Sequence, residues 1–95
     1  MHEHSSEYVE KVSLDAGFSF HPKLAEWLKQ KLQLSGKEIV TVYEAGCNEK
    51  SCPIEETVLE IEEPNGKTRI LKIGRVKDKI SKNDFVFAVN RQLGK

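Results

Sequence analysis

The residues in this chain best suited to chemistry are two cysteines, Cys47 and Cys52, which are separated by four residues. Thiolates bind zinc and other thiophilic metals, and this spacing falls within the range of a zinc half-site. The same pair could exchange disulfides, because one thiolate attacks while the second thiol resolves the product. The sequence therefore indicates Cys47 and Cys52 as a metal or thiol-redox site. The alternative is that both are small residues that anchor an irregular loop.

Further metal ligands are few. A closed tetrahedral zinc site needs two more ligands, and the only histidines are His2, His4 and His21. The first two stand at the polar start of the chain, and we expect His21 to cap a helix. We therefore expect no zinc site closed within one chain, whereas a site shared between two chains or a transiently bound metal stays open. Lys50 favours a reactive thiolate, but four neighbouring glutamates oppose it. These are Glu44, Glu49, Glu55 and Glu56.

The second half of the chain segregates its charges. Seven acids and one lysine fall between residues 44 and 63, and seven bases and one aspartate fall between residues 67 and 82. Both segments contain an arm of a predicted hairpin, so pairs across its strands should neutralise much of this charge. The expected pairs join Glu60 or Glu62 to Arg69 or Lys72. The bases beyond the hairpin are a candidate binding site for an acidic partner or a phosphate. They are Arg75, Lys77, Lys79 and Lys82.

The composition is that of an ordinary globular domain. Fifteen Lys and Arg residues balance fifteen Asp and Glu residues, and 38% of the chain is hydrophobic. A dedicated nucleic-acid-binding protein usually carries a basic excess, so we expect another protein as the partner. The start of the chain is polar and no apolar run reaches membrane-spanning length, which predicts a cytoplasmic protein without membrane association. No phosphate loop, dinucleotide fingerprint, zincin helix or nucleophile elbow occurs in the sequence.

The element around which the chain is organised is a hairpin over residues 57–74 with an Asn-Gly pair at its turn. A two-residue Asn-Gly loop would place Leu59 opposite Lys72 and mix charged and apolar groups on both faces. A type I turn followed by Gly66 in the left-handed conformation instead places Leu59 opposite Leu71. We therefore predict one solvated face and one buried face. The buried face carries Leu59, Ile61, Leu71 and Ile73.

A helix is predicted over residues 22–35. Pro22 suits its first position, and Ser35-Gly36 provides a stop. One side of this helix is apolar, and Trp27 should contribute its largest buried surface. The residues on this stripe are Leu24, Trp27, Leu28 and Leu32.

Two further strands and a second helix complete the predicted elements. Residues 8–14 and 39–43 have strand character, and the second of these strands should be central because both of its faces are apolar. Residues 45–53 favour a loop. The segment 85–93 fits either a strand or a helix, and the pair Ser81 and Asp84 before it, spaced as a capping box, favours the helix.

The resulting order is β-α-β-β-β-α. It predicts a small α+β domain over residues 8–95, with a mostly antiparallel sheet of three or four strands and two helices on one face, preceded by disordered residues 1–7. The function expected for such a chain is a non-enzymatic accessory or protein-interaction module that uses the sheet edge and the charged hairpin face. The alternative is thiol-redox, sulfur or metal handling by Cys47 and Cys52. No cofactor is expected, unless these cysteines bind zinc or another thiophilic metal.

Overall fold

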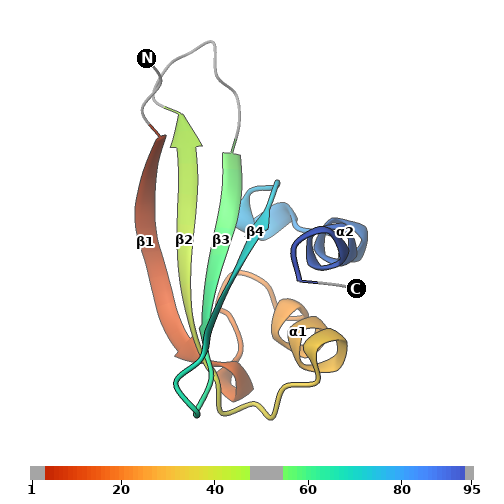
Figure 1. The fold of residues 1–95 in the computed structure, drawn as a ribbon. Coiled ribbons are helices and arrows are strands. Elements are labelled where there is room, and N and C mark those ends of the chain that lie inside the picture. The colour runs from red at the N-terminus through yellow and green to blue at the C-terminus, as the bar shows by residue number, and fades with distance from the viewer. Residues whose placement is uncertain (1–3, 48–54, 94–95) are drawn as a thin grey trace.

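The computed structural model describes residues 4–47 and 55–93, and the side chains of residues 7–45 and 56–93. Its four strands are β1 (His4–Ser13), β2 (Ile39–Cys47), β3 (Glu55–Glu62) and β4 (Thr68–Ile73). Its two α-helices are α1 (Leu24–Leu32) and α2 (Lys82–Gln92). Two short 3-10 helices are η1 (Leu14–Ala16) and η2 (Lys77–Lys79). The strands form one antiparallel sheet in the order β1-β2-β3-β4. Both α-helices lie on the same side of this sheet (Figure 1). The predicted α+β class and element order are confirmed. None of the described helices has the length and apolar character needed to cross a membrane.

The hairpin of β3 and β4 has the predicted register. Leu59 lies opposite Leu71, and Thr57 lies opposite Ile73. Gly66 has a φ of 94° and donates its N–H to the Glu63 carbonyl at 2.9 Å, so the turn places its left-handed residue at Gly66. All four apolar side chains predicted for the inner face are fully buried.

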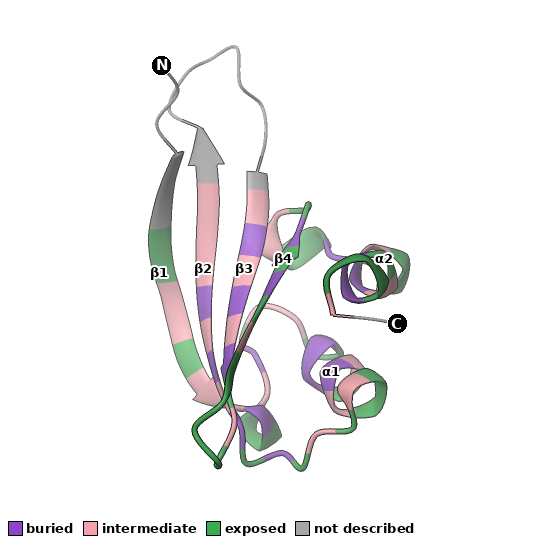
Figure 2. Cartoon of the chain, in the orientation of Figure 1, coloured by how far each residue is buried: buried purple, intermediate pink, exposed green. Residues whose placement is uncertain are grey.

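The core lies between the sheet and the two helices. Buried residues alternate along β2 and β3 and cover the sides of the helices that face the sheet (Figure 2). Phe85 is the largest fully buried side chain, while Trp27 is only partly buried and packs against the edge of the core. Strand β2 is central, as predicted, because it lies between β1 and β3.

Both predicted ends of α1 are wrong. The helix begins at Leu24, with Lys23 as its N-cap and Pro22 in the preceding turn, because a ring nitrogen of His21 accepts the N–H groups of Lys23 and Leu24. It ends at Gln33, which has a left-handed φ of 55°, and not at the Ser35-Gly36 pair. The Leu34 N–H donates to the Lys29 carbonyl and closes this end.

Strand β1 begins at His4, four residues before the predicted start at Tyr8, and it pairs with β2 along its whole length. Disorder of residues 1–7 stays a prediction, and residues 1–3 lie outside the described residues. The register shifts between Tyr8 and Glu10, which is a bulge. Glu10 is tolerated here because the N–H and hydroxyl of Ser19 both donate to its carboxylate.

Strand β2 is four residues longer than predicted and ends at Cys47, so the first part of the predicted 45–53 loop is strand. The extension is stabilised because β1 and β3 pair with it on both sides as far as Gly46. The rest of the predicted loop, residues 48–53, lies outside the described residues.

Helix α2 begins as the capping box predicts. The Ser81 hydroxyl accepts the Asp84 N–H, and the Asp84 carboxylate accepts the Ser81 N–H. Ile80 and Phe85 stand at the two positions of a hydrophobic staple, and both are buried in the same core. The helix alternative was therefore the right one for this segment. Gly94, which should follow the helix, lies outside the described residues.

The far end of α2 protects one edge of the sheet. The side-chain amide of Gln92 accepts the Lys72 N–H at 2.9 Å and donates to the Lys72 carbonyl at 2.6 Å. One amide thus fills the position that a neighbouring strand would take beside β4. Strand β1 forms the opposite edge.

Candidate functional site

The sheet presents one face to the helices and a second face away from them. We call this second surface the open face. Because successive side chains alternate, the residues between the buried ones on β2, β3 and β4 point to it. Its described residues include Tyr8, Lys11, Thr41, Tyr43, Val58, Glu60, Ile70 and Lys72.

The apolar residues of the open face are well exposed. The Tyr8 side chain is 63% exposed and Ile70 is 50% exposed. Tyr8 lies opposite Tyr43 with the two rings edge to face and 6.4 Å apart, and Tyr43 lies opposite Val58. Tyr8, Tyr43 and Val58 form a continuous apolar row across three strands, while Ile70 on the fourth strand lies opposite Glu60 and diagonal to Val58. An apolar row of this kind on a solvated sheet face is a candidate contact surface.

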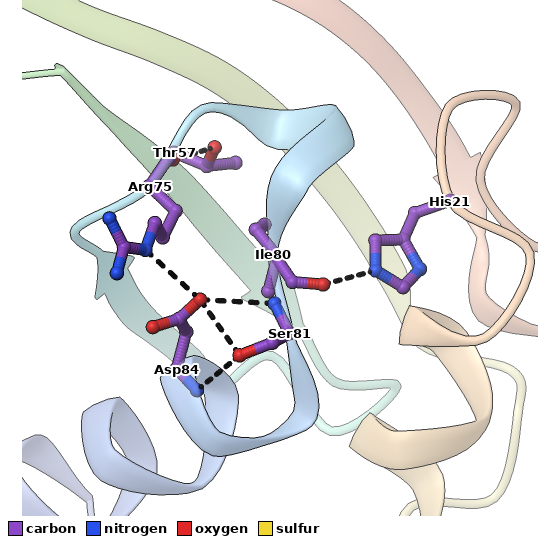
Figure 3. Close-up of polar contacts among 6 residues, drawn as sticks. All are labelled: His21, Thr57, Arg75, Ile80, Ser81 and Asp84. Atoms are coloured by element: carbon purple, nitrogen blue, oxygen red, sulfur yellow. Dashed lines mark hydrogen bonds and ion pairs between the residues drawn. The ribbon is translucent and has the colours of Figure 1, made fainter.

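Two bases of the predicted basic site are engaged in ion pairs. Arg75 Nε lies 3.2 Å from Asp84 Oδ2, and Lys77 Nζ lies 3.4 Å from Glu44 Oε2. Figure 3 shows Arg75 beside the capping box of α2, where the Asp84 carboxylate also accepts from Ser81. The Ser81 N–H lowers the pKa of Asp84, and the Ser81 hydroxyl and the Arg75 guanidinium lower it further, against the opposing effect of burial. Arg75 therefore has a structural task as well as a candidate binding role.

The hairpin charges pair differently from the expectation. Arg69 Nε lies 2.8 Å from Glu63 Oε2, whereas Glu60 and Glu62 were the expected partners. The reason is the register, which places Glu60 opposite Ile70 and Glu62 opposite Thr68, while Arg69 shares the inner face with Leu71.

His21 connects the starts of the two helices. Its Nδ1 accepts the Leu24 N–H at 3.1 Å, and its Nε2 lies 2.7 Å from the Ile80 carbonyl, just before the N-cap of α2 (Figure 3). Nε2 is the donor of this second bond because a carbonyl can only accept. The expected capping role is confirmed, and the link to Ile80 adds a tertiary one that local sequence cannot reveal.

A groove lies between α1 and α2, and sequence reasoning missed it because its walls come from two distant segments. Its volume is about 290 Å³, and it is lined by Trp27, Gln30, Lys31, Lys82, Phe85 and Val86. Two ring contacts fix the position of Trp27. Its ring centroid lies 5.0 Å from His21 and 6.1 Å from Phe85. Of the four predicted basic residues, Lys82 is the one that lines this groove.

The structure places one of the two candidate cysteines. Cys47 is the last residue of β2, and the register sets it opposite His4 on β1. Cys52 and His2 lie outside the described residues. Within the described part of the chain, no group of three His, Cys, Asp or Glu residues is arranged to hold a metal ion.

A buried carboxylate was also missed. Glu38 is only 4% exposed and accepts the N–H groups of Ser35 and Gly36 and the Ser35 hydroxyl, at 2.8 to 3.1 Å. Burial alone raises the pKa of Glu38, but these hydrogen bonds outweigh it and hold the pKa below its usual range. The sequence signal was present in Ser35-Gly36, which was interpreted as a helix stop. This carboxylate closes the loop between α1 and β2.

Comparison with known proteins finds no family model, no curated protein and no solved structure that matches this chain.

Proposed function

We propose that this chain is a non-enzymatic accessory module that recognises another protein through its open face. The observation that supports this proposal best is the one-sided covering of the sheet. Both helices pack on the inner face, whereas Tyr8 and Ile70 on the other face are at least half exposed. Tyrosine is among the residues that contribute most to binding energy at protein interfaces, because its ring is large and its hydroxyl tolerates solvent.

The surroundings of the apolar row suit a protein surface. Lys72 on β4 lies opposite Val58 at the end of the row, and Lys11 on β1 and Glu60 on β3 lie beside the row, on either side of Thr41. Mixed charge around an apolar centre is the usual arrangement of a protein interface, and it disfavours nucleic acid, which requires a predominantly basic surface. The blocked edge at Lys72 leaves β1 as the edge where a partner can extend its contact.

The basic residues Arg75, Lys77, Lys79 and Lys82 remain candidate partner contacts, although Lys82 lies on the helical side of the sheet and not beside the open face. Arg75 and Lys77 would have to exchange Asp84 and Glu44 for carboxylates of the partner. Reversing the charge of Arg75 would also disturb the start of α2. Lys79 and Lys82 are therefore the better positions for charge-reversal experiments.

Site-specific photo-crosslinking tests the open face. A photoreactive phenylalanine analogue replaces Tyr8 or Ile70 in the full chain, in cells that naturally express it, and the control carries the same group at Gln33, which is exposed and lies at the end of α1. We expect both open-face positions to give the same discrete product with a second protein, and the Gln33 position to give none of it.

Three results would refute the proposal. The first is a product that forms equally from Gln33, and the second is the absence of any product from Tyr8 and Ile70. The third is a product of twice the mass of the chain, which would identify the open face as a contact between two copies.

A second candidate function is thiol or metal handling by Cys47 and Cys52, and one observation favours it. The register brings His4 to the residue position opposite Cys47, so a histidine and a cysteine, two types of metal-binding residue, occupy facing positions at one end of the sheet. Zinc or another thiophilic metal would be the expected ion.

Native mass spectrometry of chain purified without chelator tests this second function. If the chain handles metal in this way, we expect one metal ion per chain or per dimer. This ion should be lost after alkylation of the thiols and absent in Cys47→Ala. Metal-free chain with two thiols that alkylate at the rate of a free cysteine would refute it.

A further inference from the structure

We propose that the groove between α1 and α2 binds an acidic peptide segment of a partner protein, with one large apolar side chain of that segment seated on Trp27 and Val86, above the buried Phe85. This is a second binding surface, because the groove lies on the helical side of the sheet and the open face on the other (Figure 1).

The floor of the groove is apolar and preorganised. Trp27, Phe85 and Val86 supply it, and Phe85 is 1% exposed, so the floor is continuous with the core. Trp27 is held from one side by His21 and from the other by Phe85. His21 in turn ties the start of α1 to the residue before α2. A peptide side chain would therefore enter a site whose walls are already in position, which reduces the entropy lost on binding.

The rim of the groove is basic. Among the residues that the structure describes, Lys31 and Lys82 are the only charged ones that line it, and no carboxylate does. Within the described part of the chain, neither lysine is among the residues that form ion pairs. A chain with no net charge thus concentrates two positive charges beside an apolar surface. Carboxylates next to an apolar anchor are the complementary ligand.

The position of Lys82 supports a binding role. It is the first residue of α2, where the helix dipole favours acids and disfavours a cation. A residue that breaks a local preference without a visible structural gain often serves function. Lys31, in the last turn of α1, stands where the dipole favours a cation, so the two lysines are expected to differ in their effect on stability.

The size of the groove indicates a peptide rather than a metabolite or cofactor. Its volume of about 290 Å³ lies at the lower limit of small-molecule pockets, which typically span about 300 to 1,000 Å³. One anchoring side chain fits this space, and the remainder of the segment can lie along the two helices. Recognition of an apolar anchor in a groove between helices is a common mode of peptide binding.

The test begins with the full chain and a phage-displayed library of short random peptides. We expect the selected peptides to combine a large aliphatic or aromatic residue with neighbouring Asp or Glu. A selected peptide is then titrated into the chain and followed by tryptophan fluorescence, because Trp27 is the only tryptophan and reports on the groove directly. The double variant Lys31→Gln with Lys82→Gln should lose about tenfold or more in affinity. The matched control, Lys67→Gln at the exposed hairpin turn, should bind as the wild type does.

Folding is measured on the same samples. Lys82→Gln alone should unfold at the same or a higher urea concentration than the wild type, so its loss of binding cannot be attributed to a damaged fold. A Tyr8→Ser and Ile70→Ser variant should bind the peptide normally, which separates this proposal from the open-face proposal.

The proposal is overturned if the library yields no enriched peptides, if the enriched peptides lack acidic residues, or if the lysine double variant binds them as tightly as the wild type. A single-stranded oligonucleotide that binds with the same dependence on Lys31 and Lys82, and more tightly than the peptides, would also overturn it and assign the groove to nucleic acid.

Discussion

At the scale of single residues, two polar side chains hold connecting segments of the fold in place. His21 ties α1 to the residue before α2, and Glu38 closes the loop that leads from α1 into β2. The capping role of His21 could be predicted because it stands just before a recognisable helix. The role of Glu38 could not, since its donors Ser35 and Gly36 form one of the commonest helix-stop patterns.

Replacing Glu38 by Gln should destabilise the fold. The amide keeps the size of the side chain but loses the charge and directs an NH2 group at the donors of Ser35 and Gly36. Since hydrogen bonds to a charged group contribute about 1.5–3 kcal/mol, we expect the free energy of unfolding at neutral pH to fall by about that amount. Urea titration measures it, with Glu26→Gln on the exposed side of α1 as the matched control.

The difference in stability between the wild type and Glu38→Gln should also depend on pH. The pKa of Glu38 is lowered in the folded chain, so its contribution is complete above its ordinary value of 4.5 and is lost as pH falls through the lower folded pKa. The difference in stability between wild type and Glu38→Gln should therefore shrink on acidification. A difference that stays constant, or no difference at neutral pH, would contradict this account of the loop.

At the scale of elements, local signals predicted some boundaries well and others poorly. The β3–β4 turn and the start of α2 were correct because Gly66 and the Ser81-Asp84 capping box act within a few residues. The ends of α1 were wrong because one depends on His21, and the other on a left-handed Gln33 that has no sequence signature. The predicted start of β1 was too late because pairing with β2, rather than apolar character, defines its first residues.

Replacing Asp84 by Asn tests the capping box and its link to Arg75. The variant loses the negative charge that accepts from Ser81 and pairs with Arg75, so the free energy of unfolding should fall by about 0.3–1.5 kcal/mol at neutral pH. The pKa of Asp84 is lowered in the folded chain, so this contribution is present above its ordinary value of 3.8 and disappears as pH falls through the folded pKa.

Urea titrations across the acidic range measure this change, and Asp78→Asn in η2 is the matched control because Asp78 is exposed. An Asp84→Asn chain with the stability of the wild type at neutral pH would show that the capping box contributes nothing to the fold.

At the scale of the whole molecule, the sequence predicted the layers but not the surfaces that they create. Hydrophobic alternation and helical spacing were sufficient to predict a mostly antiparallel sheet of three or four strands with helices on one side, and the structure has four strands. The groove could not be predicted, because it requires the distance between two helices that are far apart in sequence. The basic cluster was visible as a run of charges, yet the structure pairs Arg75 and Lys77 with acids from other elements. The proximity of His4 to Cys47 likewise depends on strand register.

The central claim, that the open face binds another protein, is tested most directly by quantitative affinity purification of three tagged chains from cells that naturally express the protein. These are the wild type, Tyr8→Ser with Ile70→Ser, and Cys47→Ala with Cys52→Ala, each first shown by circular dichroism to be folded. We predict one partner recovered equally with the wild type and the cysteine variant, and reduced by about tenfold or more with the open-face variant. A partner that persists with the open-face variant, or disappears with the cysteine variant, would contradict the claim.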